Sequence, residues 1–227
     1  MQAFAWSHVG LIRSINEDII ALEGWNSRDS PEGRLAHPRT SSWALIADGM
    51  GGHAAGETAS ELATMYLSEL LPVATNRAQI EKALAAIHLR LHEIAAAHAQ
   101  LAGMGTTIVG VLQQGSSVMM FNVGDSRLYR LRRGVLEMLS EDDSVGHALT
   151  QCLGGYAPEP LPVAHVSECV LEEGDRLLLC SDGLTDMVDD DAIAGILSAS
   201  HEDPAHMLVV AALEAGGYDN VSVVVLL

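Results

Sequence analysis

Residues 44–53 read ALIADGMGGH, an apolar run that stops at Asp48 and continues into a glycine-rich turn. The apolar part is typical of a β-strand, and Gly beside a strand end lets other groups approach the backbone closely. A carboxylate carried by a rigid strand end is a suitable ligand for a hard cation, and the carbonyl of Gly49 can serve as another. The stretch therefore predicts a strand whose end contributes to an oxygen-rich site.

The same arrangement occurs at three other aspartates, where an apolar run meets a turn. They are Asp125 in FNVGD, Asp182 in LLLCSD, and Asp219 just before NVSVVVLL. A lone Asp at a strand end is more often an ordinary turn residue. Four of them gathered at one edge of packed sheets would repel one another and raise each other's pKa unless cations were bound. We therefore expect a site for divalent cations.

The remaining pattern indicates two helices and several strands. Apolar residues at helical spacing run from Ala59 to Leu70, where Pro72 ends the pattern, and a second stripe runs from a cap at Asn76 to about Gln100. Strand-like runs are 18–22, 43–47, 106–112, 118–123, 127–131, 165–171, 176–180 and 221–227. Short turns between several of them favour antiparallel hairpins. The expected fold is α+β, with two mainly antiparallel sheets packed face to face and helices on the outside.

Residues 24–42 are polar and lie between two of these runs, so we interpret them as a long hairpin loop rather than a domain boundary. A second loop, 154–162, leads into a late strand. We expect residues 1–227 to form a single domain, since a chain of this length can bury a large core.

The composition narrows the possible partners. Thirty Asp plus Glu against twelve Lys plus Arg give a formal charge of −18, which disfavours binding to nucleic acid or to an anionic membrane. No apolar run reaches the roughly 18 residues needed to span a bilayer, and the N-terminus lacks a signal-peptide pattern. We expect a cytoplasmic protein.

Cysteine and helical histidine patterns do not indicate a second metal site. The three cysteines, Cys152, Cys169 and Cys180, lack CxxC spacing and are interpreted as reduced packing residues. His88 and His92 have the spacing of a zinc pair, but no third ligand or HExxH pattern accompanies them. We therefore expect both histidines to lie on a solvated face of the helix.

The segment GLIRSINED, residues 10–18, places Arg13 four and five residues before Glu17 and Asp18. A guanidinium matches two phosphate oxygens, and the acids can orient it or bind metal-ligated water. An exposed Arg beside acids is more often a surface ion pair. His53, at the end of DGMGGH, can either donate a proton to a leaving alkoxide or simply begin the following helix.

These motifs resemble, in order and approximate spacing, those of bacterial protein phosphatase 2C-like (PPM) enzymes. The matching stretches are GLIRSINED, ALIADGMGGHAAGETAS, MGTTIVG, NVGDSRLYRL, LLLCSDGLTD and GYDNVSVVV, and together they cover nearly the whole chain. The resemblance implies an α-β-β-α sandwich and a metal-dependent serine/threonine phosphatase. It also implies that two Mn²⁺ or Mg²⁺ ions occupy a core site and that a third ion binds more weakly.

By the same resemblance, Asp48 bridges two metals and the Gly49 carbonyl binds one of them. Asp182 and Asp219 bind the other, and Arg13 holds the substrate phosphate. Glu17 and Asp18 support the site through water or neighbouring contacts, and Asp125 belongs to the third metal. The implied substrate is a phosphorylated protein, and the implied partner is an opposing serine/threonine kinase.

The chain departs from the family pattern at two places. His8 replaces an Asp that many bacterial members have before the first motif's glycine. Only about ten residues separate Asp143 from Leu153, where the family commonly carries a mobile flap. A segment this short can form a helical turn or a tight loop but not a lid, so we expect only modest discrimination among phosphopeptides.

Two other functions are compatible with the motifs. A catalytically inactive PPM-fold module would bind a phosphoprotein or regulatory partner, but degenerate acids would then be expected, and all four aspartates are present. A hydrolase of small phosphate esters would keep the chemistry and change the substrate.

Overall fold

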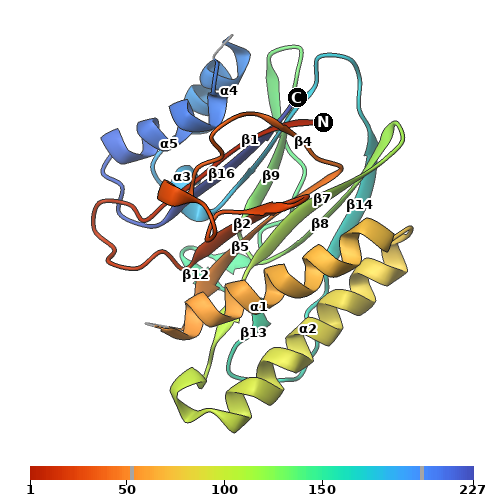
Figure 1. Cartoon of the computed structure of the whole chain (residues 1–227), viewed down its shortest axis with the longest axis vertical. Helices are drawn as coiled ribbons and strands as arrows, with labels where there is room; N and C mark the ends of the chain where they lie inside the picture. Colours follow the sequence, from red (N-terminus) through yellow and green to blue (C-terminus); the bar gives the residue numbers. More distant parts are fainter. Residues whose placement is uncertain (52–53, 200–201) are drawn as a thin grey trace.

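The computed structural model describes residues 1–51, 54–199 and 202–227. Two β-sheets lie face to face, with helices covering the outer face of each (Figure 1). Every strand pair in the described ranges is antiparallel. This arrangement confirms the α-β-β-α sandwich expected from the sequence.

The first sheet contains both ends of the chain. Its strands, in spatial order, are β10 (Val135–Met138), β9 (Arg127–Arg132), β15 (Arg176–Cys180), β16 (Val221–Leu226), β1 (Gln2–His8) and β4 (Arg39–Thr40). The N-terminal strand pairs with the C-terminal strand, with Ala3 opposite Leu226. The two termini therefore lie next to each other (Figure 1).

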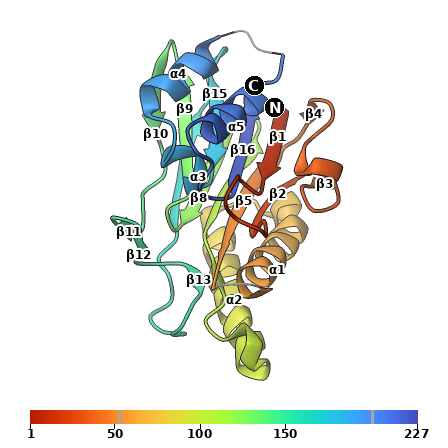
Figure 2. The same ribbon diagram turned by 90° about the vertical axis from the view of Figure 1, so that its left-hand side faces the viewer.

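The second sheet is built around β5. Its main path is β13 (Leu153–Gly154), β6 (Gly105–Thr106), β5 (Trp43–Met50), β7 (Ile108–Gln114), β8 (Ser117–Val123) and β14 (His165–Val170). β2 (Asp18–Leu22) also pairs with β5, and β3 (Trp25–Asn26) pairs with β2. Residues 24–42 thus connect the antiparallel strands β2 and β5, which confirms a long hairpin connection. A separate small hairpin, β11 (Ser144–Val145) and β12 (Ala148–Leu149), stands away from both sheets (Figure 2).

Two long helices cover the second sheet and three short helices cover the first. α1 (Ala54–Leu70) and α2 (Arg77–Ala97) lie side by side on the second sheet, and α3 (Asp182–Thr185), α4 (Asp190–Ser198) and α5 (Pro204–Glu214) lie on the first (Figure 1). Short 3-10 turns occur at Pro31–Gly33, Leu71–Val73 and Ala99–Leu101. No helix in the described ranges is both long and apolar enough to cross a membrane.

Side-chain alternation along each strand divides the core into three apolar layers. In β5, Leu45 and Ala47 pack toward α1 and α2, whereas Ala44 and Ile46 pack between the sheets. β16 alternates in the same way between the inter-sheet layer and the layer under α5. Strands that are buried on both faces have continuous apolar sequences, which explains runs such as ALIA and VSVVVL.

The two predicted helices are confirmed. Pro72 lies in the 3-10 turn that follows α1, and the Asn76 side chain accepts a hydrogen bond from the backbone N–H of Gln79 at the start of α2. The prediction that His88 lies on a solvated helix face was wrong, because only 2% of this residue is exposed. Its Nδ1 accepts from the N–H of Gly154, and its Nε2 lies 3.2 Å from the Pro158 carbonyl oxygen.

Candidate metal centre

The predicted acids come together at one end of the inter-sheet layer. Asp48 has the same strand parity as Ile46, so its side chain extends the face that packs between the sheets. Asp18, in β2, is the register partner of Asp48. In the other sheet, Asp182 comes two residues after β15, and Asp219 comes two residues before the neighbouring strand β16. The apolar layer therefore ends in a group of carboxylates.

These residues surround a cavity of about 390 Å³. Seven of the predicted site residues line it: Arg13, Glu17, Asp48, Gly49, Asp125, Asp182 and Asp219. Asp18 does not line it. Its side chain is buried behind the cavity, where Oδ2 accepts a hydrogen bond of 2.8 Å from the Ser181 hydroxyl. His53 lies outside the described residues.

Burial and mutual repulsion determine the electrostatics of this cavity. The pKa of Asp48 lies well above its usual range. Burial is the largest cause, and the negative charges of Asp18, Asp182 and Asp219 add to it. Burial and the neighbouring carboxylates also raise the pKa of Asp182 to about 7. The pKa of Asp125 is raised as well, mainly by burial. Cations in the cavity would remove this repulsion and allow all of these groups to ionise.

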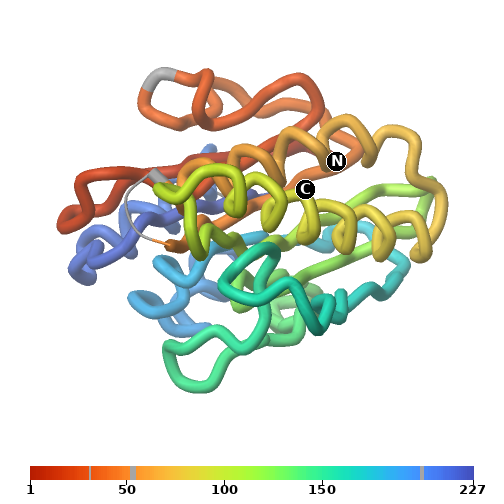
Figure 3. Tube along the Cα trace, turned by 90° about the horizontal axis from the view of Figure 1, so that it is seen from below, coloured from red at the N-terminus to blue at the C-terminus, as the bar shows by residue number. Residues whose placement is uncertain are grey.

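Arg13 supplies a positive charge at the mouth of the cavity. Its side chain is about half exposed (52%), and its Nη2 donates a 2.7 Å hydrogen bond to Asp219 Oδ2. This hydrogen bond is the main reason that the Arg13 pKa is raised. The loop that carries Arg13 lies beside the turn before β16 (Figure 3), and the N–H of Leu11 donates to the Gly217 carbonyl at 2.7 Å.

Asn220 fixes that loop, a role that the sequence reasoning missed. Its side-chain N–H groups donate to the carbonyls of Val9 and Ile15, both at 2.9 Å, and its oxygen accepts from the N–H of Glu17 at 2.8 Å. An Asn at the start of an apolar strand was the available signal, because a polar side chain beside a core strand needs polar partners.

Neighbouring strands hold the backbone at Asp48, and the next position, Gly49, has no room for a side chain. The Asp48 carbonyl accepts from the N–H of Thr107 and from the Thr106 hydroxyl, both at 2.9 Å. A Cβ built on Gly49 would lie 2.2 Å from the Gly56 carbonyl oxygen. Glycine at position 49 is therefore required by the close approach of α1 to the end of β5.

Asp186 is a second residue that the sequence reasoning missed. It lies one helical turn after Asp182, directly after α3, and lines the same cavity. The i, i+4 spacing in SDGLTD was the available signal, since such residues share a helix face.

The segment between Asp143 and Leu153, which is shorter than the family's flap, also reaches the cavity. It forms the tight β11–β12 hairpin. His147 in this hairpin lines the cavity, with its Nδ1 3.4 Å from Asp186 Oδ2.

His8, by contrast, is not among the described residues that line the metal cavity. It lies at the end of β1, where its Nδ1 accepts a 3.0 Å hydrogen bond from the N–H of Gly10. It lines a separate cavity beside Trp6 and Asn16.

The donor set suits a hard divalent cation. All the candidate side-chain ligands are carboxylates, which Mg²⁺ and Mn²⁺ prefer. Within the described ranges, no three His, Cys, Asp or Glu side chains converge closely enough to ligate one ion by themselves. Backbone oxygen and water would have to complete the ligand sets, as is common for Mg²⁺. Asp18 Oδ1 is buried and accepts no hydrogen bond from the described residues, which fits a nearby cation or water.

Comparison with known proteins places this geometry in a family. The family model described as protein phosphatase 2C matches residues 26–213, which is most of the chain. The chain belongs to the protein phosphatase 2C family. It is similar to the serine/threonine protein phosphatase PstP of Mycobacterium tuberculosis, at 35% identity over 97% of this chain and 44% of the relative. It thus spans less than half the length of PstP.

Another relative and two solved structures match over more of their own length. The serine/threonine phosphatase stp of Listeria monocytogenes is 33% identical over 79% of this chain and 81% of the relative. A crystal structure of M. tuberculosis PstP/Ppp has a TM-score of 0.81 and 32% identity, covering 99% of this chain and 98% of that chain. A structure of the PstP catalytic domain in complex with two manganese ions has a TM-score of 0.80, with the same identity and coverage.

Proposed function

We propose that this chain hydrolyses phosphoserine and phosphothreonine in proteins with the help of two divalent cations, Mn²⁺ or Mg²⁺. The observation that carries the proposal is the cavity in which Asp48, Asp182 and Asp219 meet under the guanidinium of Arg13. The names of the relatives and the manganese-bound structure of one of them support the same chemistry.

Each residue has a defined task in this proposal. Asp48 and the Gly49 carbonyl would hold one ion. Asp48 would share the second with Asp182 and Asp219, whose side chains would have to move closer together than they lie in this structure. When bound, such ions supply a water of lowered pKa that can attack phosphorus, and they neutralise charge on the phosphoryl oxygens. Asp125 would hold a third, weaker ion.

Arg13 and three other residues would bind the substrate or orient the site in this proposal. Arg13 would bind two oxygens of the phosphate, which a planar guanidinium matches in a bidentate manner. Its exposed ion pair with Asp219 is worth only about 0–1 kcal/mol, so rearranging it toward phosphate costs little. Glu17 and Asp18 would orient the site from beside and behind the cavity, and His53 remains a proposed proton donor or substrate contact.

The proposed biological context is a phosphoprotein substrate and an opposing serine/threonine kinase in the cytoplasm. The formal charge of −18 supports partners other than nucleic acid or anionic membrane. A catalytically inactive PPM-fold module is less well supported, because each predicted carboxylate is present and those at 48, 125, 182 and 219 share one cavity.

The test compares substrates and metals in the purified protein. With Mn²⁺ present, we expect turnover of phosphoserine and phosphothreonine peptides and of an aryl phosphate, and loss of turnover with a chelator. Nucleotides and sugar phosphates should be poorer substrates than the peptides. No turnover of any substrate with Mn²⁺ would favour the inactive module, and faster turnover of small metabolites would favour the small-ester hydrolase.

A further inference from the structure

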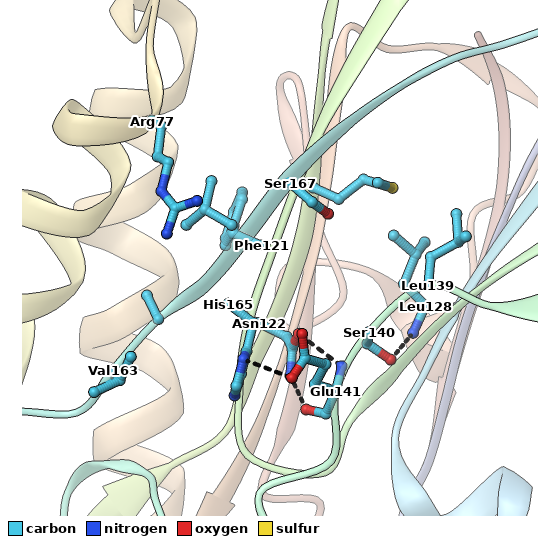
Figure 4. A pocket seen from close by; sticks show the side chains of 13 residues that line it. Arg77, Phe121, Asn122, Leu128, Leu139, Ser140, Glu141, Val163, His165 and Ser167 are labelled. Atoms are coloured by element: carbon cyan, nitrogen blue, oxygen red, sulfur yellow. Dashed lines mark hydrogen bonds and ion pairs between the residues drawn. The ribbon is translucent and has the colours of Figure 1, made fainter.

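A second cavity lies directly beside the metal centre. It has a volume of about 300 Å³, and Met50 and Leu149 line both it and the metal cavity. We call it the side cavity. A third cavity, of about 210 Å³, is formed by Phe121, Asn122 and His165 among others (Figure 4), and it shares no lining residue with the metal cavity among those described. The cavity beside Trp6 and Asn16 shares none either. Among the described residues, the side cavity is therefore the one placed to receive part of a molecule whose phosphate is bound at the metal centre.

Hydrogen bonds from two histidines of α2 hold the wall of the side cavity in place. The N–H of Gly154 can only donate, so His88 Nδ1 accepts from it at 3.1 Å and the ring proton is on Nε2. Nε2 then donates to the Pro158 carbonyl at 3.2 Å. Burial lowers the pKa of His88, which keeps this neutral form. His92 Nε2 donates to the Gly154 carbonyl at 3.1 Å. The loop that forms the wall is therefore pre-organised rather than free to collapse into the cavity.

The lining of the side cavity combines apolar surface, a few neutral polar groups and one carboxylate. Leu149, Ala157, Pro160 and Pro162 supply apolar surface, and Glu159 is the only charged carboxylate among the described lining residues, which include no Lys or Arg.

The neutral polar groups of the lining carry no charge, and Gln151 among them is already hydrogen-bonded. Gln151 donates to Asp143 Oδ1 at 2.6 Å and accepts from the N–H of Val163 at 2.7 Å. Burial raises the pKa of Cys152, so its thiol stays neutral. Glu159 is therefore the group that determines which charge the cavity accepts.

Tyr156 adds an aromatic surface to the same cavity. Its side chain packs over Gly103, and 87% of the residue is exposed. An exposed aromatic ring stacks favourably on a guanidinium or ammonium group. An apolar channel, one carboxylate and one exposed ring together match a side chain with an aliphatic stem and a cationic head.

We propose that the side cavity binds an Arg or Lys side chain of the phosphoprotein substrate, within about three residues of the phosphorylated Ser or Thr. This inference rests on the proposed function. Three residues of extended peptide span about 10 Å, which suits two cavities that share a wall. The chain's net charge of −18 also favours the approach of cationic peptide segments.

The experiment measures kcat/KM with Mn²⁺ for a set of phosphoserine peptides. One Arg is moved through the three positions on each side of the phosphoserine in an Ala background, and Leu and Glu replace it at the best position. We expect Arg to exceed Ala by about fivefold at one or two positions, with Leu near Ala and Glu lowest. The size corresponds to about 1 kcal/mol, typical of a partly exposed ion pair. The preference should decrease with added salt.

Two variants assign the preference to the side cavity. Glu159→Gln should reduce the Arg advantage to less than twofold, and Tyr156→Ala should reduce it in part. Both should leave aryl phosphate turnover within twofold of wild type, because that substrate does not reach the side cavity. Glu168→Gln is the matched control, since it removes an exposed carboxylate on β14 away from both cavities. It should leave the Arg preference unchanged.

Each outcome decides between specific alternatives. Equal kcat/KM for Arg and Ala at every position, with normal aryl phosphate turnover, would overturn the inference and leave the proposed function intact. A preference for Leu would assign the cavity to apolar side chains and overturn the basic class. An Arg preference that survives Glu159→Gln would place the recognition elsewhere. Absence of turnover of the aryl phosphate and every peptide would overturn the proposed function and this inference with it.

Discussion

Replacing Asp182 with Asn should abolish turnover and, in the absence of metal, make the protein more stable. The pKa of Asp182 is raised to about 7 by burial and by neighbouring carboxylates, whereas an unperturbed Asp titrates near about 3.9. Between these two values the folded chain holds a proton that the unfolded chain has lost. The free energy of unfolding therefore falls as pH rises from about 4 to about 7.

The size of this effect follows from the pKa change. Each tenfold change in proton affinity is worth about 1.4 kcal/mol, so the wild-type protein loses up to about 4 kcal/mol over this range. Asn carries no charge and is free of this loss. Above about pH 7.5, with a chelator present, Asp182→Asn should be about 2–4 kcal/mol more stable, which raises Tm by roughly 5–15 °C for a chain of this length. Near about pH 4 the two proteins should be nearly equal in stability, because the carboxyl is protonated in the folded state and about half protonated in the unfolded state, which leaves only a small difference.

Metal should reverse this order. Mn²⁺ stabilises whichever protein binds it in the folded state, and Asp182→Asn removes a full negative charge from the proposed ligands. The assay is thermal unfolding at both pH values with chelator and with Mn²⁺, alongside phosphopeptide turnover, with Glu168→Gln as the control. The reasoning fails if the chelated variant is no more stable than wild type at the higher pH, or if it binds two ions with wild-type affinity and keeps its rate.

Substitutions at three further positions test other parts of the molecule. Arg13→Ala should raise KM and lower kcat for a phosphopeptide, with little change in the Mn²⁺ affinity measured by calorimetry. Arg13→Lys should restore only part of the lost activity. An unchanged kcat/KM would show that Arg13 is a surface residue without a role in catalysis. Asp143→Ala removes a buried acceptor of the Gly124 N–H. Urea denaturation should show that the free energy of unfolding falls by about 2–4 kcal/mol. A decrease below about 0.5 kcal/mol would contradict a structural role for Asp143. Gly49→Ala should abolish activity and lower Tm, because its Cβ would meet the Gly56 carbonyl; wild-type activity would show that the two backbones can separate.

Much of the fold could be predicted because it depends on local patterns. The strands around β5 and the helices α1 and α2 are recognisable from apolar runs, helical spacing and the Asn76 cap. The helices α3, α4 and α5 were not anticipated, because they have only 4, 9 and 11 residues. Short helices obtain most of their stability from tertiary packing, so their own sequence gives a weak signal.

The candidate site could be predicted less completely. Asp48, Asp125, Asp182 and Asp219 stand at strand ends, and strand ends are visible in the sequence. Asn220 was missed because its importance depends on partners distant in sequence. Asp186 was missed because its i, i+4 spacing to Asp182 is informative only once α3 is known to be a helix. Neither the hydrogen bonds from Asn220 to the loop at 9–17 nor the shared cavity of Asp186 can be derived from neighbouring residues alone.

By itself, the sequence determined most of the long strands along the chain, the acids at their ends and the family resemblance, because strand propensity, side-chain alternation and turn residues are local properties. The tertiary structure decided which side chains reach the cavity. Asp18 is covered by Ser181 from the other sheet, and His88 is buried under a loop that begins more than sixty residues later in the chain. Burial depends on segments that meet only when the two sheets pack, so no local pattern can specify it.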